Sequence, residues 1–245
     1  MTAAVYERSP AETNRLAHWA GAAYLALGVA TAFGFFHAPL VRDDINALAR
    51  AMTGSDLRFR VGVVADVLTA ALTVPLAFLL YQLLKVVDKS QAALMALLLL
   101  IATPASFVIA LDYVAAQMLL SGTSGLSALT DAERDALAML FLRLHSHGVI
   151  AIEIFWGLWL LPFGLLVMRS GFLPRVLGIL LLVAGVAYVA HSVTTLLLAG
   201  QRFVVYERVT MLARAAGEFP IILWLLIKGA SGTMRAPNMQ RNSPS

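Results

Sequence analysis

The stretch that decides the fold of this chain is residues 91–120, which read QAALMALLLLIATPASFVIALDYVAAQMLL. Asp112 is its only charged residue. A helix needs about 20 consecutive apolar residues to cross the ~30 Å hydrocarbon core of a bilayer, and this run is longer than that. Pro104 would break a soluble helix, but in a membrane neighbouring groups satisfy the carbonyl that loses its partner. The stretch therefore predicts a transmembrane helix.

Five similar runs accompany it, which predicts an all-α fold: a polytopic membrane helix bundle with about six transmembrane helices. The predicted spans are residues 16–36, 61–87, 91–120, 149–168, 173–199 and 203–227. The chain is 60% hydrophobic and only 13% charged, whereas soluble domains carry about 25% charged residues. We expect residues 1–230 to form a single transmembrane domain. Residues 231–245 are rich in Ser, Pro, Asn and Arg, which predicts a disordered tail.

Two connections are predicted to be interfacial amphipathic segments. Apolar positions repeat there at i, i+3, i+4 and i+7: Ile45, Leu48, Ala49 and Met52 in the first, and Leu137, Leu140, Phe141 and Leu144 in the second. Such a stripe suits a helix lying in the membrane interface. For the second segment a further interpretation stays open, namely the outer end of one long fourth helix. Capping boxes are predicted at Ser9–Glu12 and at Thr130–Glu133.

Composition also excludes several classes of function. The chain has no cysteine, which excludes disulfides, thiolate metal sites and thiol catalysis. Its net charge of +4 fits basic residues at membrane boundaries and gives no reason to expect a nucleic-acid partner. No phosphate loop, nucleophile elbow or zinc-protease motif is present. No cleavable signal peptide is evident, because a polar leader precedes a first apolar run long enough to span. The bilayer is the one partner that these observations predict, and the oligomeric state stays open.

Six spans place both termini on one side of the membrane, which we name side A; the opposite side is side B. The Arg and Lys totals of the two sides tie, so the positive-inside rule does not decide by number. Basic residues of side A lie in short turns and in the tail with few acids nearby, whereas those of side B are interleaved with acids. This pattern predicts cytoplasmic termini.

Ionisable side chains inside the spans are the candidates for chemistry, because each is costly in lipid unless it is paired or hydrated. A rise of ~1.5 Å per residue from the side A ends places these groups from five helices in the side B half. They predict a water-accessible pocket that opens to side B, with Glu218 near its floor. The predicted catalytic residues are Glu153, His191, Glu218 and Asp66, and the predicted ligand-pocket residues are Asp112, Arg214, His147 and Tyr188. The alternative is that these groups form ordinary cross-links, with Arg214 and Glu218 paired four residues apart.

Other patterns are less specific. His145 and His147, with Glu153 and His191, offer a metal-ligand set, but histidines two residues apart point to opposite helix faces. We therefore predict no metal and no cofactor. Glu153 and His191 lie at matched depth and suit a general acid/base couple. Six glycines are interpreted as close-packing points between helices: Gly21, Gly28, Gly157, Gly164, Gly178 and Gly185.

Residues 169–188, RSGFLPRVLGILLLVAGVAY, are the most specific motif in the chain. Gly171 suits a left-handed helix cap and Pro174 suits the start of the next helix. Three further stretches belong with it: Arg15 with residues 20–25 (AGAAYL), residues 79–87 (LLYQLLKVV) and residues 223–229 (LWLLIKG). Together they resemble the bacterial membrane family known as domain of unknown function 4386, over residues 13–230.

The resemblance implies a six-helix topology in the bacterial cytoplasmic membrane. It also fits the position of Glu218 shortly before the last motif, whereas residues 97–107 lack polar residues that the family pattern has. It brings no activity, substrate or cofactor. Our first hypothesis for function is a pocket for a small hydrophobic or lipid-like ligand, with or without acid/base catalysis. The alternatives are a proton-coupled transporter, for which no inverted repeat is visible, a haem or metal protein built on His145, His147 and His191, and a structural or sensory partner protein.

Overall fold

The computed structural model describes residues 9–35, 57–121, 128–198 and 204–230. These residues form helices joined by turns, and none of them lies in a strand. The helices are α1 (Pro10–Phe35), α3 (Leu57–Leu84), α4 (Lys89–Leu120), α5 (Asp131–Leu158), α6 (Leu160–Ser170), α7 (Arg175–Leu197) and α8 (Val204–Ile227). The predicted all-α fold is confirmed. The first amphipathic segment and the predicted tail lie outside the described residues.

Six of the described helical stretches are long and apolar enough to cross a membrane. The protein is therefore a multi-pass membrane protein, as its sequence predicts. The fourth stretch extends from Asp131 to Ser170, through α5, a short break at Trp159 and α6. Residues 137–144 belong to α5, so the second amphipathic segment is the outer end of one long helix. The predicted start of this span at residue 149 was too late, because hydropathy marks the lipid-facing part of a helix and not its end.

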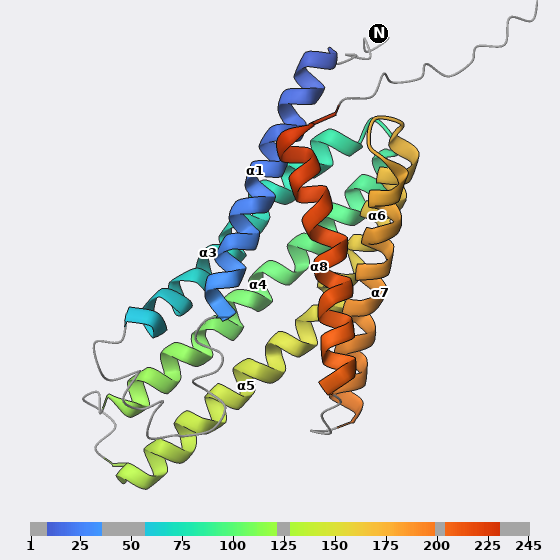
Figure 1. Ribbon diagram of the computed structural model, residues 1–245. Coiled ribbons are helices and arrows are strands. Elements are labelled where there is room, and N and C mark those ends of the chain that lie inside the picture. The colour runs from blue at the N-terminus through green and yellow to red at the C-terminus, as the bar shows by residue number, and fades with distance from the viewer. Residues whose placement is uncertain (1–8, 36–56, 122–127, 199–203, 231–245) are drawn as a thin grey trace, which may run out of the picture.

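The helices form a closed ring. Along it, α1 packs against α3, α3 against α4, α4 against α5, and α7 against both α5–α6 and α8, while contacts between α1 and α8 complete the circle. Figure 1 shows the start of α1 and the end of α8 at the same end of the bundle, which is side A. Toward side B, α4 and α5 incline away from α7 and α8 (Figure 1).

The main core fills the side A half of the ring. Its fully buried side chains include Tyr24, Leu76, Leu80, Phe163 and Leu225. A short break at Trp159 separates α5 from α6, because Pro162 has no N–H to donate to the carbonyl of Leu158. The other internal prolines, Pro75, Pro104 and Pro220, lie within continuous helices.

Glycines bring helix backbones into contact in this bundle. A Cβ atom on Gly21 would lie 2.5 Å from the backbone nitrogen of Leu226, and one on Gly157 would lie 2.5 Å from the carbonyl oxygen of Gly185. Gly164 and Gly178 meet in the same way, with a Cβ on Gly164 2.7 Å from the Gly178 carbonyl oxygen. Five of the six predicted close-packing glycines are confirmed. Gly28 is the exception, since its nearest neighbour would be a side-chain methyl of Ile222 at 4.0 Å.

The helix ends follow the predicted local chemistry. Ser9 and Glu12 form a capping box, with the Glu12 backbone N–H donating to the Ser9 hydroxyl at 3.2 Å and the Ser9 N–H donating to the Glu12 carboxylate at 3.0 Å. Thr130 and Glu133 form the second capping box. Gly171 ends α6 with a φ of 73°, the left-handed conformation that glycine adopts without steric cost. These features determine where the helices begin and end.

Candidate functional site

A buried carboxylate on α5 lies at the centre of the polar residues. Glu153 is only 6% exposed. Its Oε1 accepts a hydrogen bond from Arg214 Nη1 at 2.9 Å, and its Oε2 lies 2.5 Å from His191 Nδ1. Because these partners belong to α8 and α7, one carboxyl group joins three helices. The ion pair offsets the cost of burying both charges.

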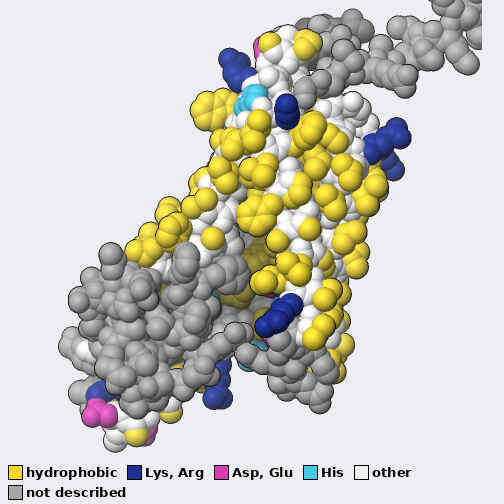
Figure 2. Space-filling model, viewed as in Figure 1, with side chains coloured by type: hydrophobic (Ala, Val, Ile, Leu, Met, Phe, Trp, Pro, Cys, Tyr) yellow, Lys and Arg dark blue, Asp and Glu magenta, His cyan; other side chains and the backbone are white. Residues whose placement is uncertain are grey.

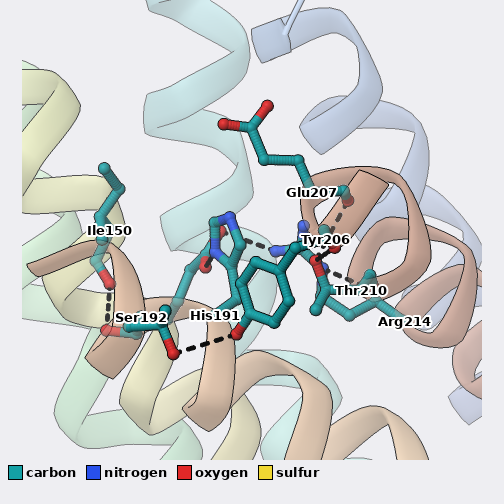
Figure 3. Close-up of polar contacts among 9 residues, drawn as sticks. Ile150, His191, Ser192, Tyr206, Glu207, Thr210 and Arg214 are labelled. Atoms are coloured by element: carbon teal, nitrogen blue, oxygen red, sulfur yellow. Dashed lines mark hydrogen bonds and ion pairs between the residues drawn. The ribbon is translucent and has the colours of Figure 1, made fainter. Parts of the chain in front are cut away.

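The contact with Glu153 determines the tautomer of the neutral His191 ring. A carboxylate only accepts hydrogen bonds, so Nδ1 must carry the proton and Nε2 becomes the acceptor of the neutral ring. The ring stacks on Tyr206, with centroids 6.3 Å apart and planes 17° apart. The Tyr206 hydroxyl donates to Thr194 Oγ1 at 3.2 Å. Figure 3 shows His191 and Tyr206 side by side, with Arg214 next to them and the carboxylate of Glu207 turned away.

Arg214 is held on three sides. Besides the bond to Glu153, its Nε donates to the Thr210 carbonyl at 3.2 Å, and its guanidinium carbon lies 4.9 Å from the centre of the Tyr188 ring. Its Nη2 donates to no residue that the structure describes. The side chains of Arg214 and His191 keep 16% and 14% of their surface exposed. Each side chain is therefore held in place by its contacts and is not completely buried.

A second carboxylate lies closer to side A. Glu218 accepts a hydrogen bond from the Tyr24 hydroxyl at 2.6 Å and another from the Tyr188 hydroxyl at 2.8 Å. These contacts join α8 to α1 and α7. The alternative in which Arg214 pairs with Glu218 is not what the structure shows, because Arg214 forms its ion pair across the bundle with Glu153. Tyr188 links the two carboxylates, with its hydroxyl on Glu218 and its ring against Arg214. We name the connected set the central network; it consists of Tyr24, Glu153, Tyr188, His191, Arg214 and Glu218.

The structure does not bring every predicted site residue to this network. Asp66 on α3 lies against Gly34 of α1, where a Cβ atom would be 2.4 Å from Asp66 Oδ1. Asp112 is half-buried on α4. His147 is exposed, and its Nδ1 lies 2.8 Å from the Arg143 carbonyl oxygen. None of these three residues takes part in the hydrogen bonds that join the central network.

The histidines of α5 point in different directions. His145 is buried, with Nδ1 2.8 Å from the Ile109 carbonyl oxygen and its ring centroid 3.8 Å from that of Tyr113. His147 is exposed on another face. In the part of the chain that the structure describes, no three His, Cys, Asp or Glu side chains are grouped so that they could hold a metal ion. The haem or metal hypothesis therefore gains no support from the positions of these histidines.

A comparison of the sequence with models of known families gives a match that contains the whole central network. A family model described as a domain of unknown function, DUF4386, matches residues 19–229. The chain belongs to DUF4386. The match extends from α1 to the end of α8 and includes every residue of the central network. No curated protein and no solved structure matches the chain. Membership in DUF4386 thus supports the membrane fold and carries no activity with it.

Two residues at the DUF4386 site were not among the predicted site residues. Tyr24 lies within the AGAAYL stretch that marks the family resemblance, so a search of the motifs for hydrogen-bond donors would have found it. Tyr206 lies in the side B part of the last span, where the depth count could have included it. Ser192 is another polar residue nearby; it is fully buried and its hydroxyl donates to the Ile150 carbonyl at 2.6 Å.

The surface of this DUF4386 protein is hollowed toward side B. Figure 2 shows a concave area beside the lower half of the bundle, with histidine and Lys or Arg side chains near its rim and apolar side chains over the half above it. The position agrees with the divergence of α4 and α5 from α7 and α8 (Figure 1).

Proposed function

We propose that this protein binds a lipid-soluble ligand through a neutral polar group at the central network, with His191 as the general base. The observation that supports the proposal is that the Glu153 carboxylate contacts both His191 and Arg214. One buried carboxylate holds His191 by Nδ1 and Arg214 by Nη1, which leaves an acceptor, His191 Nε2, and a donor, Arg214 Nη2, on side chains that are not completely buried. Such a pair suits a hydroxyl or carbonyl group.

The charges favour a neutral ligand head. The positive charge of Arg214 is already balanced by Glu153 at 2.9 Å. Glu218 accepts hydrogen bonds from two uncharged groups, the hydroxyls of Tyr24 and Tyr188. An anionic head would therefore add uncompensated negative charge in a region of low dielectric constant, which is costly. Aromatic rings surround the polar edges: Tyr206 stacks on His191, and Trp156 meets Tyr188 edge-on with centroids 6.3 Å apart. These surfaces suit an apolar ligand body.

The same groups support proton transfer. In the proposed step, His191 Nε2 accepts a proton from the ligand, Glu153 stabilises the resulting imidazolium, and an Arg214 N–H donates to the oxygen on which negative charge develops. A proton removed next to a carbonyl, or from a hydroxyl, fits this set of roles. In the neutral ring, the supporting carboxylate keeps the proton on Nδ1, so the lone pair is on Nε2.

Transport gains less support. Beyond Glu218, α8 continues toward side A with Ile221, Ile222 and Leu225, which are buried in the apolar core. A proton carrier needs polar groups or water across the membrane, whereas these three side chains of α8 are apolar. A binding site that opens to one side agrees better with the packing.

The proposal is tested by the lipid that the protein retains. The wild-type protein is purified in mild detergent, extracted with solvent and analysed by mass spectrometry against a detergent blank. We expect a neutral lipophilic compound in the wild type and a loss of tenfold or more in His191→Ala and Arg214→Gln, since each removes one of the two polar contacts. Arg134→Gln, at the outer end of α5 where Arg134 is paired with Asp131, is the control and should retain the compound. Equal retention in all four proteins would rule the proposed site out.

A further inference from the structure

The outer end of α5 carries an exposed apolar face beyond the length that a membrane span requires. The helical stretch Asp131–Ser170, formed by α5 and α6, has 40 residues, which corresponds to about 60 Å, or twice the hydrocarbon thickness. Counted from Arg169, the ~30 Å limit is reached near Val149. Leu140 and Leu144 lie beyond it and are still 58% and 53% exposed. Apolar side chains with this exposure suit the boundary between acyl chains and head groups.

Two basic side chains flank this apolar face. Arg143 and His147 are both exposed and lie four residues apart, on the helix stripe next to Leu140 and Leu144. His147 Nδ1 is occupied by the Arg143 carbonyl, so Nε2 points away from the helix backbone. Arg143 forms no ion pair with any described residue, whereas Arg134 of the same helix is paired with Asp131. The sequence has no acidic residue between Asp135 and Glu153.

We infer that this face of α5 is a binding site for the head group of an anionic phospholipid. Arg143 and His147 hold the phosphate, and Leu140 and Leu144 lie along the adjoining acyl chain. Arginine forms charge-assisted hydrogen bonds with phosphate oxygens through its planar guanidinium group. The exposed leucines distinguish a lipid from free phosphate, because a soluble anion gains nothing from them. The absence of acids in this stretch of sequence favours a net negative head group over a zwitterionic one.

The test uses the full-length protein in detergent micelles, titrated with phosphatidylglycerol or with phosphatidylcholine, with bound lipid counted by native mass spectrometry. The wild type is expected to bind phosphatidylglycerol more tightly. Arg143→Gln should weaken that binding about fivefold, the effect of one basic residue near an anionic surface. The double variant Arg143→Gln with His147→Gln should remove most of the preference, and Arg143→Lys should keep most of it because the charge remains.

Two controls keep the outcome clear. Arg134→Gln removes the same charge from a position already paired with Asp131, so it should leave the preference unchanged. An excess of inorganic phosphate should not displace the lipid, whereas displacement would indicate a plain anion site and overturn the assignment. An unchanged preference for phosphatidylglycerol in the folded Arg143→Gln variant, judged by its unfolding temperature, would overturn it as well.

Discussion

The helices are held together by close packing in one half of the bundle and by polar contacts in the other. In the side A half, glycines allow backbones to touch and apolar side chains fill the remaining space. In the side B half the helices diverge (Figure 1), and single polar groups reach across: Glu153 joins three helices, and Glu218 joins α1, α7 and α8 nearer the middle. Close packing leaves no space, whereas long polar side chains connect helices and still leave room for a ligand.

The largest effect is expected where the polar half loses its central charge. Glu153→Leu leaves Arg214 buried without its partner, and breaking such a pair by removing one member costs about 3 to 5 kcal/mol. The additional change Arg214→Leu removes the stranded charge and should recover much of the loss. Thermal unfolding of both variants in the same detergent measures the loss of stability and its recovery. A double variant no more stable than Glu153→Leu would show that the pair does not connect the helices electrostatically.

An intermediate effect is expected in the close-packed half. Gly21→Ala places a methyl group 2.5 Å from the backbone nitrogen of Leu226, and overpacking of this kind costs about 1 to 3 kcal/mol. Gly28→Ala is the matched control on the same helix, with open space and a gain in helix propensity of up to about 1 kcal/mol. The two variants should shift the unfolding temperature in opposite directions. A similar shift in both would mean that α1 and α8 do not depend on backbone contact.

A smaller effect is expected where the two halves meet. Tyr24→Phe keeps the ring in the core but removes one of the two donors to Glu218, which should cost about 1 kcal/mol, the typical net value of a hydrogen bond. Tyr81→Phe is the control, because the Tyr81 hydroxyl bonds to no described residue. Denaturation curves of the two variants give the difference. If Tyr81→Phe were equally destabilising, the contact between Tyr24 and Glu218 would not contribute to stability.

The smallest effect on stability, near zero, is expected of the variants that test orientation. The chain has no cysteine, so single substitutions need no altered background. Ser90→Cys lies at the side A end of α4, and Ser121→Cys lies at its side B end. If the termini are cytoplasmic, as the charge pattern predicts, an impermeant thiol reagent added to intact cells labels Ser121→Cys alone. Labelling of Ser90→Cys alone would place the hollow on the cytoplasmic side.

The fold was predictable because lipid imposes one simple demand on the sequence, namely long apolar runs with polar ends. The candidate site was predictable only in part. Counting residues along each helix gives depth, and it correctly placed Glu153 and His191 at the same level. Depth carries no information on the direction around the helix axis, which depends on packing between helices. For this reason the count included Asp66 and His147, which face elsewhere, and it missed Tyr24.

The alternative of a pair between Arg214 and Glu218 has the same limitation of depth and spacing along one helix. Arg214 and Glu218 are four residues apart, so their own helix predicts a contact between them. The structure shows both side chains directed to other helices, because each finds there a partner that the local sequence does not reveal. Bonds across a bundle cannot be derived from one helix at a time.

Because of the break at Trp159, a small rotation at this turn would produce a large displacement at the far end of α5. The helix below it, Asp131–Leu158, has 28 residues and is therefore about 42 Å long. A rotation of roughly 5° at the proline-weakened turn would move its far end by close to 4 Å, while the glycine contacts above the turn stay in place. Below the turn, the contact of Gly157 with Gly185 and the bonds of Glu153 to His191 and Arg214 hold α5 against α7 and α8, so these contacts set the angle at which α5 leaves the turn.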